Sequence, residues 1–314
     1  MTAPPLLVIA GPTATGKTGL SIKVARRLRA DGIAAEIISA DSRQVYRGLD
    51  IGTAKVSVGE RGGVPHHGLD LVEPDQPYSV ADYVRDARGA LGGIAERGGL
   101  AILVGGTGLY LRAIVRGLDP EALPSDPEAR RRINATIEAT GVDAAADRLR
   151  TLAPLRAARV DLRNPRRVAR ALEVAELIGD EPLPPERPYD GPIGWVGLTL
   201  DAATHAAWIG RRARSQFEAG LLDEARALRE RFDPTLPAFS AIGYREAWAV
   251  LDGQLDLEAA IELDARRNRQ FAKRQATWFR REPGMTWLDA ETDQVPTLLE
   301  LGRRLASSAA AVKA

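Results

Sequence analysis

A glycine-rich run near the N-terminus carries the clearest chemistry in the sequence. Residues 11–18 read GPTATGKT, which matches the phosphate-loop pattern G-x-x-x-x-G-K-[ST]. Glycines let such a loop curl so that backbone N–H groups point at phosphate oxygens, and the helix that follows adds a favourable dipole. We expect Lys17 to reach a phosphate and Thr18 to bind Mg²⁺ or a phosphate oxygen. The whole loop is a candidate diphosphate or nucleotide site: Gly11, Pro12, Thr13, Ala14, Thr15, Gly16, Lys17 and Thr18.

Two further polar positions follow apolar runs that read as buried strands. Asp41 comes just after the run 35–39, and Thr107 lies in GGTGLY, which follows the run 100–104. The carboxyl ends of parallel strands form the active sites of open α/β sheets. Asp41 could hold Mg²⁺, act as a base or only cap a turn. Thr107 could cap a helix or bind a substrate oxygen.

Composition excludes several other kinds of site. The 314 residues include no cysteine and three histidines, so disulfides, thiolate metal sites and a cysteine nucleophile are impossible. The 43 basic and 42 acidic side chains give a net charge of +1, so any nucleic-acid surface must be a local patch. No run approaches the length of a membrane span, and we expect a soluble, cytoplasmic protein.

Alternating strand and helix patterns predict the fold. Apolar runs alternate with helical spacing through the first third of the chain, with strands expected at 6–10, 35–39, 67–72 and 100–104. This alternation predicts an α/β fold, a P-loop NTPase-like parallel sheet flanked by helices. Helices are expected at 17–29, 79–97, 127–140, 142–152, 164–178, 204–219, 222–231, 240–252, 257–280 and from about 293.

The pattern changes after Gly117, where prolines and helices replace the strand–helix alternation. We interpret residues 118–192 as a helical insertion domain. Residues 1–117 and 193–314 then form the catalytic core, with strands at 194–200 and 285–288.

A phosphate loop alone does not select a reaction, but the motifs along the chain together resemble one family. They are GPTATGKT (11–18), SADSRQVYRGLDIGTAK (39–55), VPHHGLDLVEP (64–74), YSVADYVRDA (78–87), LVGGTGLYLRA (103–113), NPRRVARALEV (164–174), AIGYREAW (241–248) and KRQATWFR (273–280). In this order and across nearly the whole chain, they resemble the bacterial tRNA dimethylallyltransferases.

The resemblance implies an activity and its partners. A dimethylallyl group would pass from dimethylallyl diphosphate to the exocyclic amine of the adenine 3′-adjacent to the anticodon in tRNA, releasing pyrophosphate. Asp41 would be the general base, Thr107 would contact both substrates, and Arg212 would hold the pyrophosphate. Lys17, Thr18 and the N–H groups of residues 13–16 would cradle the diphosphate, with Mg²⁺ as its counter-ion on Thr18. We expect a monomer that has no membrane partner.

The resemblance also implies a surface for the tRNA anticodon stem-loop, to which the insertion domain 118–192 would contribute. Its residues would be Asp41, Ser42, Arg43, Gln44, Thr107, Arg130, Arg166, Arg167, Val168, Ala169, Arg170, Ser240, Ala241, Ile242, Gly243, Tyr244 and Arg245. Two arginine-rich tracts, 148–170 and 266–281, contain almost no acidic residues, which favours phosphate contacts over a merely solvated helix face. The aromatic pair Trp278 and Phe279 is expected in the core.

Three alternative functions share some of these features. An adenylate isopentenyltransferase would use Lys17, Thr18 and Asp41 but would need neither the insertion nor the arginine tracts. An RNA-binding protein that hydrolyses ATP would show RNA-stimulated turnover. A small-molecule kinase would use paired arginines in a lid, which the insertion could imitate.

Overall fold

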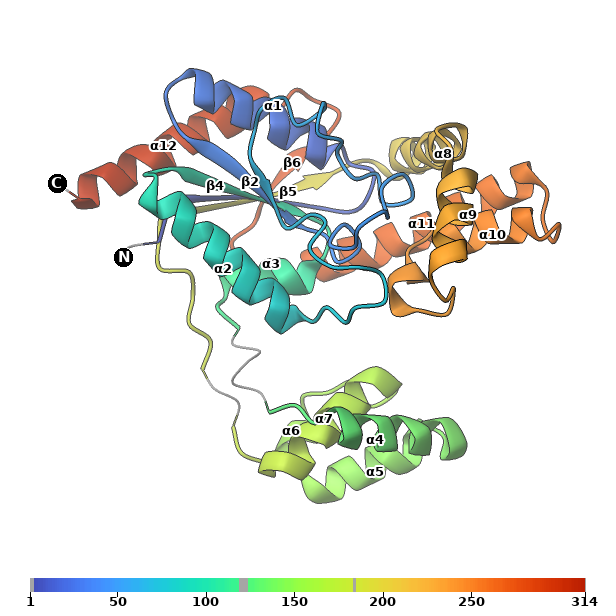
Figure 1. The fold of residues 1–314 in the computed structure, drawn as a ribbon. Coiled ribbons are helices and arrows are strands. Elements are labelled where there is room, and N and C mark those ends of the chain that lie inside the picture. The colour runs from blue at the N-terminus through green and yellow to red at the C-terminus, as the bar shows by residue number, and fades with distance from the viewer. Residues whose placement is uncertain (1–2, 119–123, 183–184, 314) are drawn as a thin grey trace. The chain divides into compact units, whose positions relative to one another are not determined.

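The chain folds as two compact units (Figure 1). The computed structural model describes residues 3–118, 124–182 and 185–313. The larger unit comprises 1–117 and 188–314, and the smaller comprises 118–187. Of the expected insertion, residues 119–123 and 183–184 lie outside the described residues.

The smaller unit ends earlier than the expected boundary at 192. Residues 188–192 belong with the larger unit because they are bonded to its first strand. The Tyr189 hydroxyl donates to the Pro4 carbonyl at 2.6 Å, and the Leu6 N–H donates to the Pro192 carbonyl at 2.8 Å.

The larger unit is built on the expected parallel sheet, which confirms the fold class. Its six strands lie in the order β3-β2-β4-β1-β5-β6, and every pairing is parallel. Ala40, Gly105 and Ala10 are paired in register at the ends of β2, β4 and β1. The loops after these strands therefore start side by side. The strands are β1 (Leu6–Ala10), β2 (Ala35–Ala40), β3 (His66–His67), β4 (Leu100–Gly105), β5 (Ile193–Thr199) and β6 (Thr286–Asp289).

Helices cover both faces of this sheet (Figure 1). α1 (Lys17–Ala30) and α12 (Val295–Lys313) pack on one face, and α2 (Val80–Glu96) and α3 (Gly108–Val115) pack on the other. Ser79 caps α2 in a capping box with Asp82, as its sequence predicts. A further helical group follows β5: α8 (Ala202–Glu218), α9 (Leu221–Arg231), η1 (Pro237–Ser240), α10 (Tyr244–Leu251) and α11 (Leu257–Phe279).

The smaller unit is a helical bundle with its own apolar core, in which Ile133, Leu149 and Leu172 are buried. Its helices are α4 (Pro127–Thr140), α5 (Val142–Leu152), α6 (Pro154–Ala157) and α7 (Pro165–Ile178). Within the described residues of both units, we find no helix with the length and apolar character needed to cross a membrane.

Two element predictions are wrong. The expected strand at 67–72 is only the two-residue β3, because Gly68 and Asp70 adopt left-handed φ angles of 80° and 54° that break an extended chain. The expected helix at 240–252 begins only at Tyr244, because Gly243 has φ 112°.

Candidate active site

The phosphate loop forms a curled turn between β1 and α1. Gly11, Ala14 and Gly16 have φ angles of 144°, 58° and 76°. A Cβ on Gly11 would lie 2.8 Å from the Leu198 carbonyl oxygen, so only glycine fits there. Gly16 caps α1 without a side-chain hydrogen bond, and the first turn of α1 holds no acidic residue. The helix N-terminus is therefore open to an anion.

Hydrogen bonds of Thr13 connect this loop to helices α8 and α11. Its N–H donates to Gln275 Oε1 at 2.8 Å, its carbonyl lies 2.8 Å from His205 Nε2, and its hydroxyl accepts from Arg212 Nη1 at 2.6 Å. In this structure the Thr13 N–H is already bonded to Gln275, so its expected contact with diphosphate would require that bond to be replaced and stays a prediction. The N–H groups of residues 14–16 remain the candidate cradle.

Two cations and one carboxylate set the charge of the site. Lys17 Nζ donates to the Pro12 carbonyl and, at 3.3 Å, to Thr15 Oγ1. Burial and the Arg212 charge lower the pKa of Lys17 to about 7, against an opposing effect of Asp41. Burial also lowers the pKa of Arg212, although the charges of Asp41 and Asp264 partly offset this. The excess positive charge would be relieved by a bound anion.

Asp41 and Thr107 lie on neighbouring loops that are bonded to each other. The Ser42 N–H donates to Thr107 Oγ1 at 3.0 Å, and the Arg43 N–H donates to Asp41 Oδ1 at 2.8 Å. Asp41 therefore does cap a turn, yet Oδ2 accepts no hydrogen bond from the described residues. Thr107 makes no capping bond to α3, so its hydroxyl proton can be donated to a ligand.

Most of these groups line one cavity of about 260 Å³, whereas Thr107 follows the lining residues Gly105 and Gly106 and does not itself line it. Asp41, Lys17 and Arg212 line it together with the phosphate loop, and Ile37, Val56, Leu69 and Val104 supply an apolar part. The structure thus brings together the expected base, the phosphate cradle and the expected arginine. Arg212 is distinguished from its neighbour Arg214, which is exposed and paired with Glu258.

The cavity suits a magnesium ion that arrives with a phosphate ligand. No group of three or more His, Asp or Glu side chains among the described residues could hold a metal alone. Thr18 lines the cavity and offers a hydroxyl, and Asp41 lines it with a carboxylate. Mg²⁺ prefers such oxygen ligands and commonly keeps phosphate and water oxygens in its shell, so the residues present fit the ion.

Gln44, expected to recognise a base, has both ends of its amide engaged within the protein. Ser39 Oγ donates to Gln44 Oε1 at 3.1 Å, and Gln44 Nε2 donates to the Thr53 carbonyl at 3.2 Å. Arg43 Nη1 donates to the Pro237 carbonyl at 2.9 Å. These bonds fix the loop after β2 in the apo protein.

Several residues expected at the tRNA surface are buried. Val168 and Ala169 lie in the core of the smaller unit because they occupy the inner face of α7. Ala241 and Tyr244 lie in the core of the helical group after β5, where Tyr244 donates to Glu224 at 2.7 Å. The side chains of these four residues are therefore not exposed in this structure, and the role of their positions in tRNA binding stays a prediction. Three neighbours remain at least partly exposed: Ser240, Ile242 and Arg245.

In the smaller unit, the expected arginines divide into paired and free side chains. Arg130 and Arg170 both bond the fully buried Glu173. Burial alone would raise the pKa of Glu173, but these bonds outweigh it and hold the pKa below its usual value. Arg166 and Arg167 are exposed and form no ion pair with the described residues.

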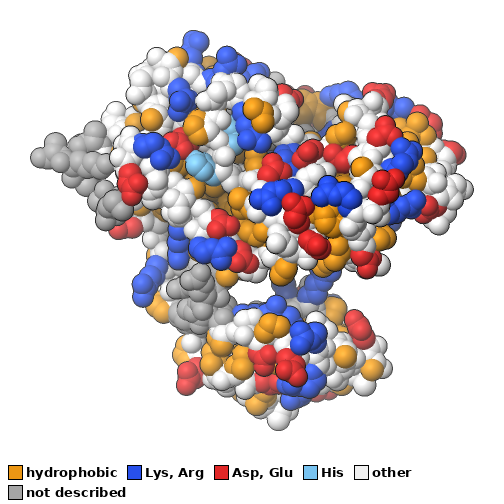
Figure 2. Space-filling model, in the orientation of Figure 1, with side chains coloured by type: hydrophobic (Ala, Val, Ile, Leu, Met, Phe, Trp, Pro, Cys, Tyr) orange, Lys and Arg blue, Asp and Glu red, His pale blue; other side chains and the backbone are white. Residues whose placement is uncertain are grey.

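Only some of the basic side chains in the second arginine tract, 266–281, are free of an ion pair with the described residues. Arg267 is paired with the buried Glu246. By contrast, Arg269, Lys273 and Arg280 line a groove of about 760 Å³ that has no acidic residue in its lining. On the face shown in Figure 2, basic and acidic side chains are interspersed, as the near-zero net charge implies. Phe279 is fully buried, as expected, whereas Trp278 is only partly buried and lies under the Arg112 guanidinium.

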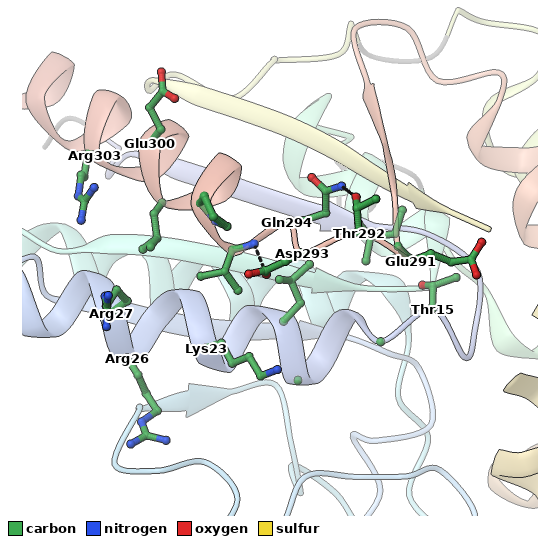
Figure 3. A pocket seen from close by; sticks show the side chains of 18 of the residues that line it. Thr15, Lys23, Arg26, Arg27, Glu291, Thr292, Asp293, Gln294, Glu300 and Arg303 are labelled. Atoms are coloured by element: carbon green, nitrogen blue, oxygen red, sulfur yellow. Dashed lines mark hydrogen bonds between the residues drawn. The ribbon is translucent and has the colours of Figure 1, made fainter.

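A larger hollow of about 1310 Å³ lies beside the outer face of α1 (Figure 3). Four basic side chains, Lys23, Arg26 and Arg27 from α1 and Arg303 from α12, line the hollow together with three acidic side chains, Glu291, Asp293 and Glu300. It shares Thr15 and Gly16 with the smaller cavity but lacks the base and both site cations, so we assign the chemistry to the smaller cavity.

Sequence reasoning missed two residues that build the site. Gln275 Nε2 also donates to the Gly106 carbonyl at 2.9 Å, which links the loops after β1 and β4. The Thr53 carbonyl accepts from Arg212 at 3.4 Å as well as from Gln44. Both residues lie within the family-like motifs, which is the only sequence signal that could have found them.

Comparison with known proteins agrees with the family resemblance of the motifs. The profile of a family described as IPP transferase matches residues 44–282. A tRNA dimethylallyltransferase from Symbiobacterium thermophilum is 44% identical over 91% of this chain and 89% of its own length. Another from Anaeromyxobacter dehalogenans strain 2CP-1 is 46% identical over 90% of this chain and 92% of its own.

Two solved structures of tRNA-modifying transferases are also similar to this chain. The full-length tRNA isopentenylpyrophosphate transferase from Bacillus halodurans is 40% identical and superimposes with a TM-score of 0.70, covering 96% of this chain and 95% of its own. A eukaryotic dimethylallyltransferase crystallised while acting on tRNA is 27% identical with a TM-score of 0.73, covering 92% of this chain and 74% of its own.

Proposed function

The chain belongs to the IPP transferase family, and we propose that it transfers a dimethylallyl group from dimethylallyl diphosphate to tRNA. The acceptor is the exocyclic amine of the adenine 3′-adjacent to the anticodon, and pyrophosphate leaves. The observation that carries this proposal is the shared cavity in which Asp41 lies with the phosphate loop and Arg212.

The bonds that break and form in this reaction assign a role to each group in the site. The bond between the prenyl carbon and the diphosphate oxygen breaks, and a bond from that carbon to the adenine nitrogen forms. Asp41 accepts the proton that the amine loses, through the oxygen that is not bonded to Arg43. A positioned base of this kind contributes about 10²–10⁴-fold to rate. Thr107 donates its hydroxyl proton to a substrate oxygen.

The phosphate loop and the two cations of the cavity stabilise the leaving group. Negative charge grows on the diphosphate as the bond breaks, and preorganised donors aimed at it lower the barrier. The donors are the N–H groups of residues 14–16, Lys17 and Arg212. A Mg²⁺ ion, held by Thr18 and the phosphates, would supply further charge neutralisation. All these groups come from one chain, which supports action as a monomer.

The tRNA contacts come from exposed basic residues. Arg166 and Arg167 in the smaller unit, and Arg269, Lys273 and Arg280 in the larger, are free to bind phosphates. The target base must leave its stack to reach Asp41, which costs less in a loop than in a duplex.

Labelled dimethylallyl diphosphate, Mg²⁺ and an unmodified tRNA transcript test the proposal directly. We expect label on the tRNA at the single adenine beside the anticodon. Parallel reactions with AMP and with ATP separate the alternatives. Label on AMP alone, or ATP consumption with an unaltered tRNA mass, would overturn the proposed function.

A further inference from the structure

Asp264 on α11 is a buried acid that the proposed mechanism does not use. The residue is 1% exposed. Its Oδ1 accepts from Asn268 Nδ2 at 2.7 Å, whereas Oδ2 is buried with no hydrogen-bond partner among the described residues. Burying a carboxylate oxygen without a hydrogen-bond partner costs folding free energy, so its presence here requires an explanation.

Arg212, on the adjoining helix α8, also has a buried polar atom without a hydrogen-bond partner in the described part of the chain. Its Nε is buried and has no hydrogen-bond partner among the described residues, while Nη1 bonds the phosphate loop at Thr13. α8 and α11 pack against each other (Figure 1). The charges of Arg212 and Asp264 each favour the ionised form of the other, although the two side chains do not form a direct ion pair.

The remaining neighbours of Asp264 cannot satisfy its free oxygen. Glu246 repels it and is already paired with Arg267. Gly243 closes over it so tightly that a Cβ there would lie 3.2 Å from Oδ2. Burial raises the pKa of Asp264 to about 6, which leaves the carboxylate ionised at neutral pH. The charge of Arg267 also favours the ionised carboxylate, but Arg267 is paired with Glu246 and does not line the cavity. Arg212 is therefore the one of these two cations through which Asp264 can act on the site.

We propose that Asp264 is a positioning residue that holds the Arg212 guanidinium in the cavity, oriented to bind the leaving pyrophosphate. The identity of that ligand rests on the proposed function. Asp264 does not line the cavity, whereas Arg212 does, so Asp264 acts on Arg212 and not on the substrate. Its charge offsets part of the cost of burying the arginine, so that the guanidinium is in place before the diphosphate arrives.

A double-mutant cycle on the binding of inorganic pyrophosphate, with Mg²⁺ and by calorimetry, tests this role. Asp264→Asn keeps the shape and the bond to Asn268, and we expect it to weaken pyrophosphate binding about tenfold, within the range of coupled charges. In the Arg212→Gln background, the same change should have almost no effect. Glu262→Gln, which removes an exposed charge from the same helix, is the matched control and should bind like wild type.

Two outcomes would overturn the proposal. One is unchanged pyrophosphate affinity in Asp264→Asn. The other is an equal loss with and without Arg212, which would indicate a general structural effect. Circular dichroism and thermal unfolding establish that each variant is folded, and Asp264→Ser replaces the asparagine variant in the cycle if that variant is not. The wild-type tRNA assay is independent of this cycle, so failure of the proposed reaction would be recognised separately.

Discussion

Gln275 and Thr13 lie 262 residues apart in the chain, and their 2.8 Å hydrogen bond holds the phosphate loop against α11. Gln275 also bonds the Gly106 carbonyl. A Cβ on Gly106 would lie 2.4 Å from the Gln275 amide nitrogen, so that glycine is needed for the contact. One buried amide therefore sets the spacing between the diphosphate side of the site and the loop that carries Thr107.

Gln275→Ala should loosen both loops at once. It leaves a backbone donor and a backbone acceptor without their partner, which we expect to lower the free energy of unfolding by about 1–3 kcal/mol. We also expect a higher KM for dimethylallyl diphosphate and a lower kcat. Steady-state kinetics and urea unfolding measure the two effects. Gln270→Ala, an exposed position on the same helix, should change neither, and wild-type kinetics in Gln275→Ala would contradict the bridging role.

Asp41→Ala should abolish turnover while leaving tRNA binding within a few-fold of wild type. Loss of a positioned base removes about 10²–10⁴-fold in rate. Single-turnover prenylation and filter binding of tRNA separate chemistry from affinity. Normal turnover at saturating tRNA, with a large loss of tRNA affinity, would assign Asp41 to recognition instead.

The sequence predicted the part of the site that depends on strand ends. The phosphate loop, Asp41 and Thr107 each follow a short buried strand, and parallel strands bring such positions to one edge of the sheet. Their adjacency follows from the register of β2, β4 and β1. The positions that could not be predicted in this way, such as Gln275 and Asp264, come from α11, whose packing against these loops leaves no local pattern.

A motif also cannot say which of its side chains face outward. Arg166 and Arg167 are exposed, whereas the adjacent Val168 and Ala169 are buried, because α7 turns its apolar face to the core of the smaller unit. Helical periodicity alone would have separated them. Arg130 differs again, because its buried partner Glu173 lies on another helix.

Lys17 should make diphosphate binding depend on pH. Its pKa of about 7 in the free site reflects burial and the Arg212 charge. A bound diphosphate favours the charged amine and so raises this pKa. Above pH 7 the complex therefore holds more protons on Lys17 than the free protein does, and affinity should fall by up to about tenfold per pH unit. Below pH 7 Lys17 is charged in both states and contributes no slope.

Calorimetric titration with pyrophosphate between pH 6 and 9 measures this slope. Pyrophosphate titrates in the same range, so the comparison is with Lys17→Arg, whose side chain stays charged throughout. We expect the variant to show the ligand's own pH dependence only. Identical slopes in the two proteins would show that Lys17 does not take up the proton.

Reversing the charges of Arg166 and Arg167 to glutamate should weaken tRNA binding and reduce its dependence on salt. Each lost phosphate contact lowers the slope of log affinity against log salt by about 0.7–0.9, so two contacts should lower it by about 1.4–1.8. The combined Arg88→Glu and Arg304→Glu variant makes the same change in net charge at two exposed arginines of the larger unit that form no ion pair with the described residues, and it is the control. If both double variants alter the slope equally, the effect is one of total charge and these α7 arginines do not contact tRNA. A reduced slope only in the α7 variant, with unchanged pyrophosphate affinity, is the result that we expect.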